Sequence, residues 1–458
     1  MKKLYSLAVL LAFFVAFSCG KPEAVTPTED NNNKEEQTTP DTPVPTPEPE
    51  PEPEPQPDPQ PVQSPEGCVE NDIVYAYMQC GTYEKFGAKT WFKDPVVKAT
   101  SDLYNGKYDR PKGISVSWEA KADVTVSLST GGTVVWEDSA TEADSYSFMG
   151  VIPGVTYNYT VSAGGAVVKE GSFTPTGLVR MVDIPGTWNY RDIGGWTGLG
   201  GKPVRYGWLY RGASLNGKFI GTEKTEDVYD YTKYEWTPAM QKATDFLGIK
   251  AELDLRGDLN DIGLWGNEYD SHSGTLRHAQ IEGADFIHIM SDFGIHHPKE
   301  RSSIVQDVAW IIYELQQGKP VAFHCKSGAD RTGAVALLLE GLLGVTEGDA
   351  ARDYELTTLS TEKTTKYTKY ASEAISYLFF TRKGGIFSME GETFQEKCYF
   401  YLNQFFEDVH INADDLDWFI GFMLDYDGFQ RPANAKNYEN NPLETVFSID
   451  TGSGLHTY

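Results

Sequence analysis

The sequence predicts two folded regions, a small all-β sandwich followed by a larger α/β domain whose mainly parallel sheet is flanked by helices. Residues 113–175 alternate apolar and polar side chains with a period of two, as half-buried strands do. Beyond residue 177, strand-like and helix-like segments alternate along the chain. Within this second region, Cys325 and Arg331 bracket a short glycine-containing loop between a strand and a helix.

The β region is expected to occupy residues 67–176. Its alternating runs are residues 115–118, 124–129, 133–137, 156–163 and 166–173. Gly131-Gly132 and Gly164-Gly165 lie between such runs, where glycine supplies the backbone freedom that tight hairpin turns need. Residues 68–112 show no clear pattern, and we expect them to add strands or to form a lead-in.

The α/β region is expected to occupy residues 177–458. Its predicted elements are a helix opened by Thr237-Pro238 and stopped at Gly248, strands at 249–255 and 285–290, a helix from Ser302 or Ser303 to Gly318, a strand at 321–324, a helix ending near Leu343, a helix capped by Thr346, and helical segments around 366–381 and 393–424. Helix, strand, loop and helix in this order are typical of a mainly parallel sheet.

The first 19 residues are expected to form an export signal. Lys2 and Lys3 precede an apolar run that is too short to span a bilayer comfortably, and the run ends at Cys19. This arrangement resembles a bacterial lipoprotein signal, which implies a membrane anchor through a lipidated Cys19. The expected location is the outer membrane or cell surface, on the periplasmic or extracellular face. The alternative is ordinary secretion with cleavage near Ser18.

Residues 20–66 are expected to form a disordered linker. This stretch is rich in proline and glutamate and almost free of apolar side chains, so it cannot bury a core and favours extended geometry. Such a spacer would hold a folded body away from a membrane. The formal net charge of the whole chain is −27, which argues against a nucleic-acid partner.

Three cysteines lie outside both the lipoprotein-type signal and the catalytic loop. Cys68 and Cys80 are close enough in sequence to be bridged in an exported protein. Cys398 is expected to be buried among apolar side chains. The spacing of the cysteines does not match a zinc site, and we expect no metal and no cofactor.

The segment His324–Gly333, HCKSGADRTG, carries the predicted chemistry. A loop between the end of a strand and the start of a helix turns several backbone N–H groups toward one point, and the helix dipole reinforces that anion site. Cys325 is expected to act there as a thiolate nucleophile. The phosphate-binding residues are expected to be Lys326, Ser327, Gly328, Ala329, Asp330, Arg331 and Thr332.

The loop predicts a double displacement through a cysteinyl-phosphate. Arg331 would bind two phosphoryl oxygens at once, and Thr332 would offer its hydroxyl to the sulfur when the thiolate leaves. No metal is required, because the N–H groups and the guanidinium stabilise the charge. The predicted substrate is a phosphorylated protein or a small phosphate ester.

The pattern His-Cys-x5-Arg-Thr-Gly resembles the signature loop of the protein tyrosine phosphatase superfamily. Further segments resemble one branch, the bacterial tyrosine/serine phosphatases related to the secreted mycobacterial phosphatase B; they are TWNYRDIGG (187–195), RYGWLYRGASL (205–215), ELDLRG (252–257) and DYELT (353–357). The resemblance covers residues 180–360. It implies activity on phosphoproteins and in some members on phosphoinositides. Outside the loop, the alternative for these residues is a buried hydrogen-bond network.

The sequence departs from this branch at one position of the loop. Branch members read Gly-Lys-Asp-Arg where this chain has Gly328, Ala329, Asp330 and Arg331. Lys326, beside the nucleophile, could restore part of the missing positive charge. The departure weakens the expectation of phosphoinositide activity.

The general acid has two candidates. Asp330 matches the aspartate of the branch's own loop, to which the acid role is attributed. Asp292 precedes Cys325 at a spacing that resembles the mobile-loop aspartate of other tyrosine phosphatases. We favour Asp330, and we expect His324 to orient the loop by hydrogen bonding.

The β region also carries a resemblance and an alternative function. IPGVTYNYTV (152–161) resembles the end of a fibronectin type III-like domain. The main prediction is an exported, membrane-anchored phosphatase. One alternative is an inositol phosphate (phytase-like) or phosphoinositide phosphatase. Another is a surface binding protein with a vestigial phosphatase domain.

Overall fold

The structure is a computed structural model. It describes residues 63–79, 111–215, 218–219, 234–256, 281–288, 298–325, 327–360, 385–404, 411–437 and 443. The expected signal and almost all of the expected linker lie outside these residues, as do Cys19 and Cys80. In the described segments, no helix is both long and apolar enough to cross a bilayer.

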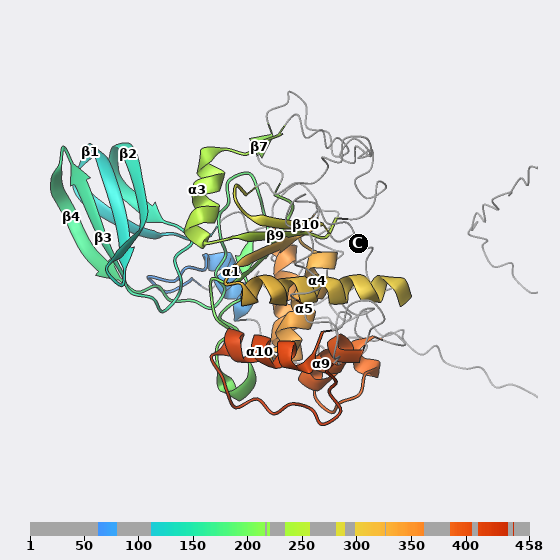
Figure 1. The fold of residues 1–458 in the computed structure, drawn as a ribbon. Helices are drawn as coiled ribbons and strands as arrows, with labels where there is room; N and C mark the ends of the chain where they lie inside the picture. Colours follow the sequence, from blue (N-terminus) through green and yellow to red (C-terminus); the bar gives the residue numbers. More distant parts are fainter. Residues whose placement is uncertain are drawn as a thin grey trace, which may run out of the picture. The chain divides into compact units, whose positions relative to one another are not determined.

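A five-stranded sheet forms the centre of the α/β region (Figure 1). In spatial order its strands are β10 (Asp285–His288), β9 (Ala251–Asp254), β11 (Val321–His324), β6 (Leu209–Gly212) and β5 (Arg191–Asp192). The first four strands are parallel and β5 is antiparallel at the edge. The strands expected at 249–255, 285–290 and 321–324 are therefore confirmed, and the sheet is mainly parallel as predicted.

The long helices largely follow the predicted stop and start signals. They are α3 (Pro238–Leu247), α4 (Pro298–Gln316), α5 (Asp330–Leu342), α6 (Glu347–Glu355), α9 (Phe394–Gln404) and α10 (Ala413–Leu424). Thr237 caps α3, and Gly248 ends it in the left-handed conformation with φ 73°. Thr346 caps α6 by accepting a hydrogen bond from the N–H of Asp349.

One helix prediction needs correction. Helix α4 begins at Pro298 rather than at Ser302 or Ser303, because proline suits a first helical position as well as serine suits a cap. The helical character expected for the segment 393–424 is found in α9 and α10. The helix expected at 366–381 lies outside the described residues. The short elements are β7 (Lys218–Phe219), β8 (Tyr234–Glu235) and the 3-10 turns η3 (Leu199–Gly201), η6 (Leu356–Leu359) and η8 (Ile386–Ser388).

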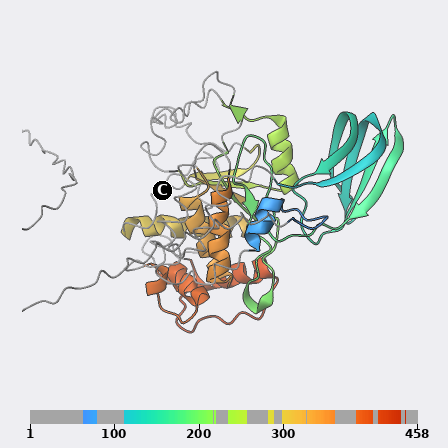
Figure 2. The same cartoon turned by 180° about the vertical axis from the view of Figure 1, so that it is seen from behind.

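Helix α5 runs through the core of the α/β region (Figure 2). Every residue from Arg331 to Leu342 is buried, because the helix contacts α4, α6 and α9 as well as β6 and β11. A helix with apolar residues all round its circumference is expected only in such a position. The core that encloses α5 holds the start of this helix rigidly beside the end of β11.

The β region differs from its prediction. The described residues there form one four-stranded antiparallel sheet in the order β2-β1-β3-β4, not two facing sheets. Its strands are β1 (Ile114–Thr130), β2 (Thr133–Phe148), β3 (Tyr157–Ala163) and β4 (Ala166–Phe173). The runs 115–118 and 124–129 were expected as separate strands, but they join into β1 across an irregular stretch of its pairing with β2. Gly131-Gly132 and Gly164-Gly165 turn the hairpins as expected, with positive φ at all four glycines.

The β sheet is an insertion in the α/β region rather than a domain that simply precedes it. Helix α1 (Asp72–Met78) lies before the sheet in sequence, yet Val74, Ala76, Tyr77 and Met78 belong to the same hydrophobic core as α5. Residues 72–78 of the expected β region 67–176 thus contribute to the core of the α/β region. An amphipathic helix of seven residues gave too weak a pattern to assign from the sequence.

The two ends of the insertion are joined by hydrogen bonds. The N–H of Val69 donates to the carbonyl of Thr176, and the Glu70 carboxylate accepts the N–H groups of Leu178 and Val179 at 2.5 and 2.8 Å. Glu70 is 2% exposed. Cys68 at this junction is a buried free thiol, in contrast to the bridge to Cys80 that its position allowed. Cys398 is buried in the core, as expected.

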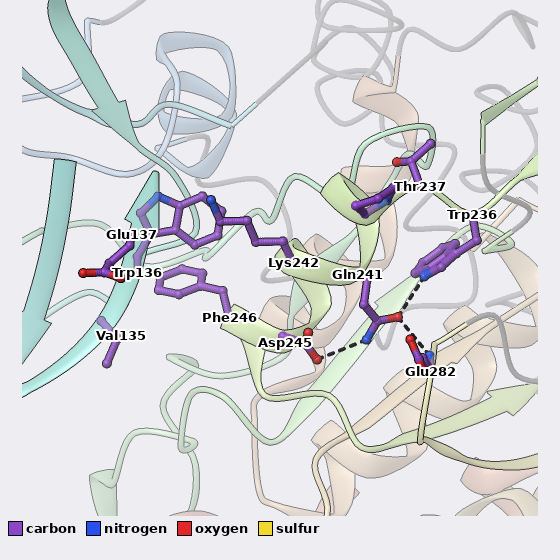
Figure 3. A pocket seen from close by; sticks show the side chains of 11 residues that line it. Val135, Trp136, Glu137, Trp236, Thr237, Gln241, Lys242, Asp245, Phe246 and Glu282 are labelled. Carbon is purple, nitrogen blue, oxygen red and sulfur yellow. Dashed lines mark hydrogen bonds between the residues drawn. The ribbon is translucent and has the colours of Figure 1, made fainter. Parts of the chain in front are cut away.

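A pocket of about 540 Å³ opens between β2 and α3 (Figure 3). Trp136, Trp236 and Phe246 line it. Lys242 lies 4.3 Å from the centre of the Trp136 ring and forms an ion pair of 2.8 Å with Asp138. None of residues 324–333 lines this pocket, so it is separate from the predicted chemistry.

Candidate active site

The predicted catalytic loop joins the end of β11 to the start of α5. Cys325 directly follows β11 and is 3% exposed. Gly328 has φ 65°, and a Cβ at this position would lie 2.4 Å from the carbonyl carbon and oxygen of Gly212. A side chain at Gly328 would therefore be strained by its φ and blocked by β6 at once. The expected strand–loop–helix setting is present.

The loop exposes backbone donors to one point. Among the described residues, the N–H groups of Ser327, Gly328 and Ala329 donate to no acceptor. The carbonyls of Ser327 and Gly328, in contrast, both accept hydrogen bonds from side chains. Consecutive backbone N–H groups at a helix N-terminus form an anion site.

Arg331 and Thr332 lie in the first turn of α5. Arg331 is 6% exposed, and its Nη1 donates to the carbonyl of Leu255, just after β9, at 3.3 Å. The Thr332 hydroxyl is fully buried and has no hydrogen-bond partner within the described part of the chain. Both side chains thus come from the helix turn that follows Cys325, as the spacing of the motif requires.

The two candidates for the general acid differ in what the structure describes. Asp330 is the first residue of α5 and is partly exposed, with its Oδ1 3.5 Å from the hydroxyl of Tyr354. Burial and the neighbouring Asp330 charge raise the pKa of Tyr354 well above its usual range, so this hydroxyl remains a donor. Asp292 and Lys326 lie outside the described residues.

His324 occupies a fully buried position behind Cys325. Its Nε2 lies 3.1 Å from the Glu252 carboxylate, and its Nδ1 lies 3.3 Å from the carbonyl of Cys325. The backbone carbonyl of His324 accepts the N–H of Leu255 at 2.8 Å. These contacts join the end of β11 to β9, as an orienting role for His324 requires.

Asn189 contacts the loop from below. Its Nδ2 donates to the carbonyls of Ser327 and Gly328 at 3.1 and 3.2 Å, and it lies 3.1 Å from the hydroxyl of Thr357. The backbone of Asn189 is left-handed, with φ 57°. A non-glycine residue in this region is uncommon and often marks a functional constraint.

Two buried arginines and one aspartate lie beside Asn189, and together the four side chains form a polar layer beneath the loop. Asp353 accepts hydrogen bonds from Arg191 at 2.8 Å and from Arg211 at 2.6 Å. Arg191 also donates to the side-chain oxygen of Asn189 at 2.8 Å, and Arg211 to the carbonyl of Gly328 at 3.1 Å. Burial opposes ionisation of Asp353, but the two arginine charges outweigh it and lower its pKa.

Other polar residues of the quoted segments have structural partners. Asp192 forms a buried ion pair of 2.8 Å with Arg180 and accepts the N–H groups of Gly194 and Gly207. Asp254 accepts from the backbone and the guanidinium of Arg256. The alternative of a buried hydrogen-bond network therefore holds for these residues.

The sequence pattern alone predicts no role for Arg211, Asp353 or Thr357. Arg211 and Asp353 are 142 positions apart, so no local pattern could pair them. The available signal was the presence of both residues in the segments that resemble one phosphatase branch. Three of these segments meet beneath the loop.

Comparisons with known proteins agree with a phosphatase-type loop. A family model described as "Tyrosine phosphatase family" matches residues 182–420, just over half of the chain. A curated Cupriavidus necator protein named "Putative tyrosine-protein phosphatase" is 27% identical over 187 residues. That alignment covers 36% of this chain and 59% of the relative's own length.

A solved structure is also similar. It is kinase associated phosphatase with its catalytic cysteine replaced by serine, at 17% identity and a TM-score of 0.23. The likeness covers 36% of this chain and 83% of the other.

The loop and its setting define a cysteine-dependent phosphatase-type site. The extent of the family match then places the chain itself: it belongs to the tyrosine phosphatase family.

Proposed function

We propose that this protein is a cysteine-dependent phosphomonoester hydrolase, acting as a protein tyrosine/serine phosphatase. One observation carries the proposal. Cys325 stands at the end of β11, facing a loop whose N–H groups have no acceptor among the described residues, with Arg331 in the following helix turn. That combination supplies a nucleophile and an anion site in one place.

The proposed reaction has two displacements. The Cys325 thiolate attacks the phosphorus atom, the bond to the leaving oxygen breaks, and Asp330 gives that oxygen its proton. A water molecule then attacks the cysteinyl-phosphate and passes a proton to Asp330, while the phosphorus–sulfur bond breaks. The buried Thr332 hydroxyl supports the departing thiolate, and inorganic phosphate is released.

A phosphorylated protein is the substrate that fits best. Ala329 is 2% exposed and offers no positive charge where the resembling branch has lysine. Further phosphates on an inositol ring would need several cations around the site. A phosphoprotein presents a single phosphoryl group to the loop, so it does not need these additional cations.

We also propose that the protein is exported and held to a membrane through a lipidated Cys19. The basic start, the short apolar run and the proline- and glutamate-rich residues that follow support this proposal. Metabolic labelling with a fatty acid should mark the native protein, and a Cys19→Ala variant should lose the label. Equal labelling of the native protein and Cys19→Ala would show that Cys19 carries no lipid anchor.

The activity is tested with an aryl phosphate, in the presence of a metal chelator. The wild-type chain should release phosphate, vanadate should inhibit it, and Cys325→Ser should be inactive. A wild type without activity, or a Cys325→Ser variant with equal activity, would overturn the proposed function. Phosphotyrosine peptides, phosphoserine peptides and inositol phosphates then separate the substrate classes. Faster hydrolysis of the inositol phosphates would replace the protein substrate by the phytase-like alternative.

A further inference from the structure

The layer of polar side chains beneath the catalytic loop has no assigned role in the reaction. It consists of Asn189, Arg191, Arg211 and Asp353, all at most 5% exposed, and Asn189 and Arg211 bond directly to loop carbonyls. These side chains are buried beneath the loop. An effect on the reaction would therefore pass through the loop.

The geometry of the peptide bond shows what these hydrogen bonds do. In a trans peptide unit, the carbonyl of one residue and the N–H of the next point in opposite directions. When the carbonyl of Ser327 is held by Asn189, the N–H of Gly328 is turned away from Asn189. When the carbonyl of Gly328 is held by Asn189 and Arg211, the N–H of Ala329 is turned away in the same manner.

We propose that Asn189 and Arg211 are positioning residues of the phosphate loop. By holding the carbonyls of Ser327 and Gly328, they keep the N–H groups of Gly328 and Ala329 directed at the phosphoryl group. The inference rests on the proposed function, and it names the residues that prepare the loop for a phosphoryl group before any substrate arrives.

Asn189 is itself held in place. Its side-chain oxygen accepts from Arg191 at 2.8 Å, and Arg191 is fixed by Asp353 through its Nε and Nη2. This bond also settles which end of the Asn189 amide faces the loop, because only the nitrogen can donate to the carbonyls. A preorganised donor set stabilises charge without reorganisation during the reaction.

The same layer adds positive charge beneath the loop. Arg191 and Arg211 share the single carboxylate of Asp353. Glu340 on α5 is the other nearby acid, and burial, followed by the charge of Asp353, raises its pKa well above its usual range. Two guanidinium groups thus face one carboxylate beneath the loop.

Asn189→Gly is the decisive variant. Glycine adopts a φ of 57° without strain, so the change spares the backbone. It removes the two carbonyl bonds together with the side-chain bonds to Thr357 and Arg191. We expect the dissociation constant for inorganic phosphate, measured by titration calorimetry on the full chain, to rise roughly tenfold. KM for an aryl phosphate should rise as well, and the pH dependence that reports the general acid should stay where it is.

Substitutions of Arg211 provide a second test of the positioning role, with lysine as the conservative variant. Arg211→Met should weaken phosphate binding roughly tenfold to hundredfold, and Arg211→Lys should recover part of it, because lysine keeps the charge but not the forked geometry. Thermal unfolding checks that each variant is folded, and Asn189→Gly decides alone if the Arg211 variants do not fold.

The outcomes distinguish failure of the proposed function from failure of the positioning role. If the wild-type chain binds no phosphate, the proposed function fails. If it binds phosphate and folded Asn189→Gly binds equally well with an unchanged KM, the positioning role is overturned and the layer is structural only.

Discussion

The conformation of the catalytic loop requires that residue 328 has no side chain. Gly328 has φ 65°, and the backbone of Gly212 lies where its Cβ would be. Gly212 is in turn pressed by the ring of Tyr190, which would lie 2.1 Å from a Cβ at residue 212. The loop, the end of β6 and Tyr190 are therefore stacked without room for a methyl group at either glycine.

Gly328→Ala should abolish most of the activity. The substitution forces either a strained φ or a displaced loop, and a displacement of about 1 Å in an active site can cost on the order of a hundredfold in rate. The measurement is kcat/KM for an aryl phosphate. Gly318→Ala is the matched control, because Gly318 has φ 74° and no atom within 4 Å of a Cβ. It should lose about 1–2 kcal/mol of stability and keep its activity. Equal activity losses in both variants would remove the steric argument.

The general acid can be assigned from the pH–rate profile. A general acid acts in its protonated form, so activity falls as pH rises through its pKa. Asp330→Asn should lower kcat about a hundredfold or more and flatten that basic limb, whereas Asp292→Asn should leave it in place. The reverse pattern would assign the role to Asp292.

At the scale of elements, helix α6 ends in a buried acid. Glu355, at the end of α6, is fully buried, and burial raises its pKa to about 8 from 4.5, against a weaker opposite effect of its bond to Thr358. A carboxyl with a raised pKa stabilises the fold while it is protonated. Stability from this group is therefore present at low pH and is lost as pH rises from about 4.5 to about 8.

Glu355→Gln should make the protein less sensitive to alkaline pH. Each unit of the pKa shift is worth roughly 1.4 kcal/mol, so the wild type should lose a few kcal/mol across this range. Urea unfolding at pH 5 and pH 9 tests the expectation. The difference between the two pH values should shrink in Glu355→Gln, and an unchanged difference would show that Glu355 is ionised without cost.

The elements around Cys325 were the most predictable part of the fold. Caps, stops and apolar periodicity at Thr237, Gly248 and Thr346 are local signals, and the structure follows them. The layer beneath the loop could not be derived in the same way, because Asn189, Arg211 and Asp353 are brought together only by the parallel sheet and the packing of α6. The sequence therefore predicts the nucleophile and its loop, but not the buried side chains that hold the loop.

At the scale of the molecule, the β sheet interrupts the catalytic region rather than preceding it. The chain contributes α1 to the catalytic core, leaves to form the sheet and returns at Thr176, where Val69 pairs with it. The sequence had indicated two successive regions, because a seven-residue helix is too short to reveal a period. The catalytic region is thus completed by residues on both sides of the sheet.

A chain that begins at residue 177 should therefore fold poorly. It lacks Val74 and Tyr77, which are both fully buried in the core, and burial of each such side chain is worth about 1.5–3 kcal/mol. A chain that begins at residue 63 should keep the full unfolding temperature. Tyr77→Ala in the full chain should also lower the unfolding temperature, because it should cost about 3–5 kcal/mol of stability. Equal unfolding temperatures for the two shortened chains would restore the original boundary.

In the proposed reaction the phosphoryl group is bound covalently to Cys325 before water releases it. Rapid acid quenching during turnover of an aryl phosphate, followed by peptide mass spectrometry, detects this intermediate. We expect one phosphoryl group on the peptide that contains Cys325, and none in Cys325→Ser. Phosphate release by the wild type without that adduct, or an adduct on another residue, would contradict the proposed reaction.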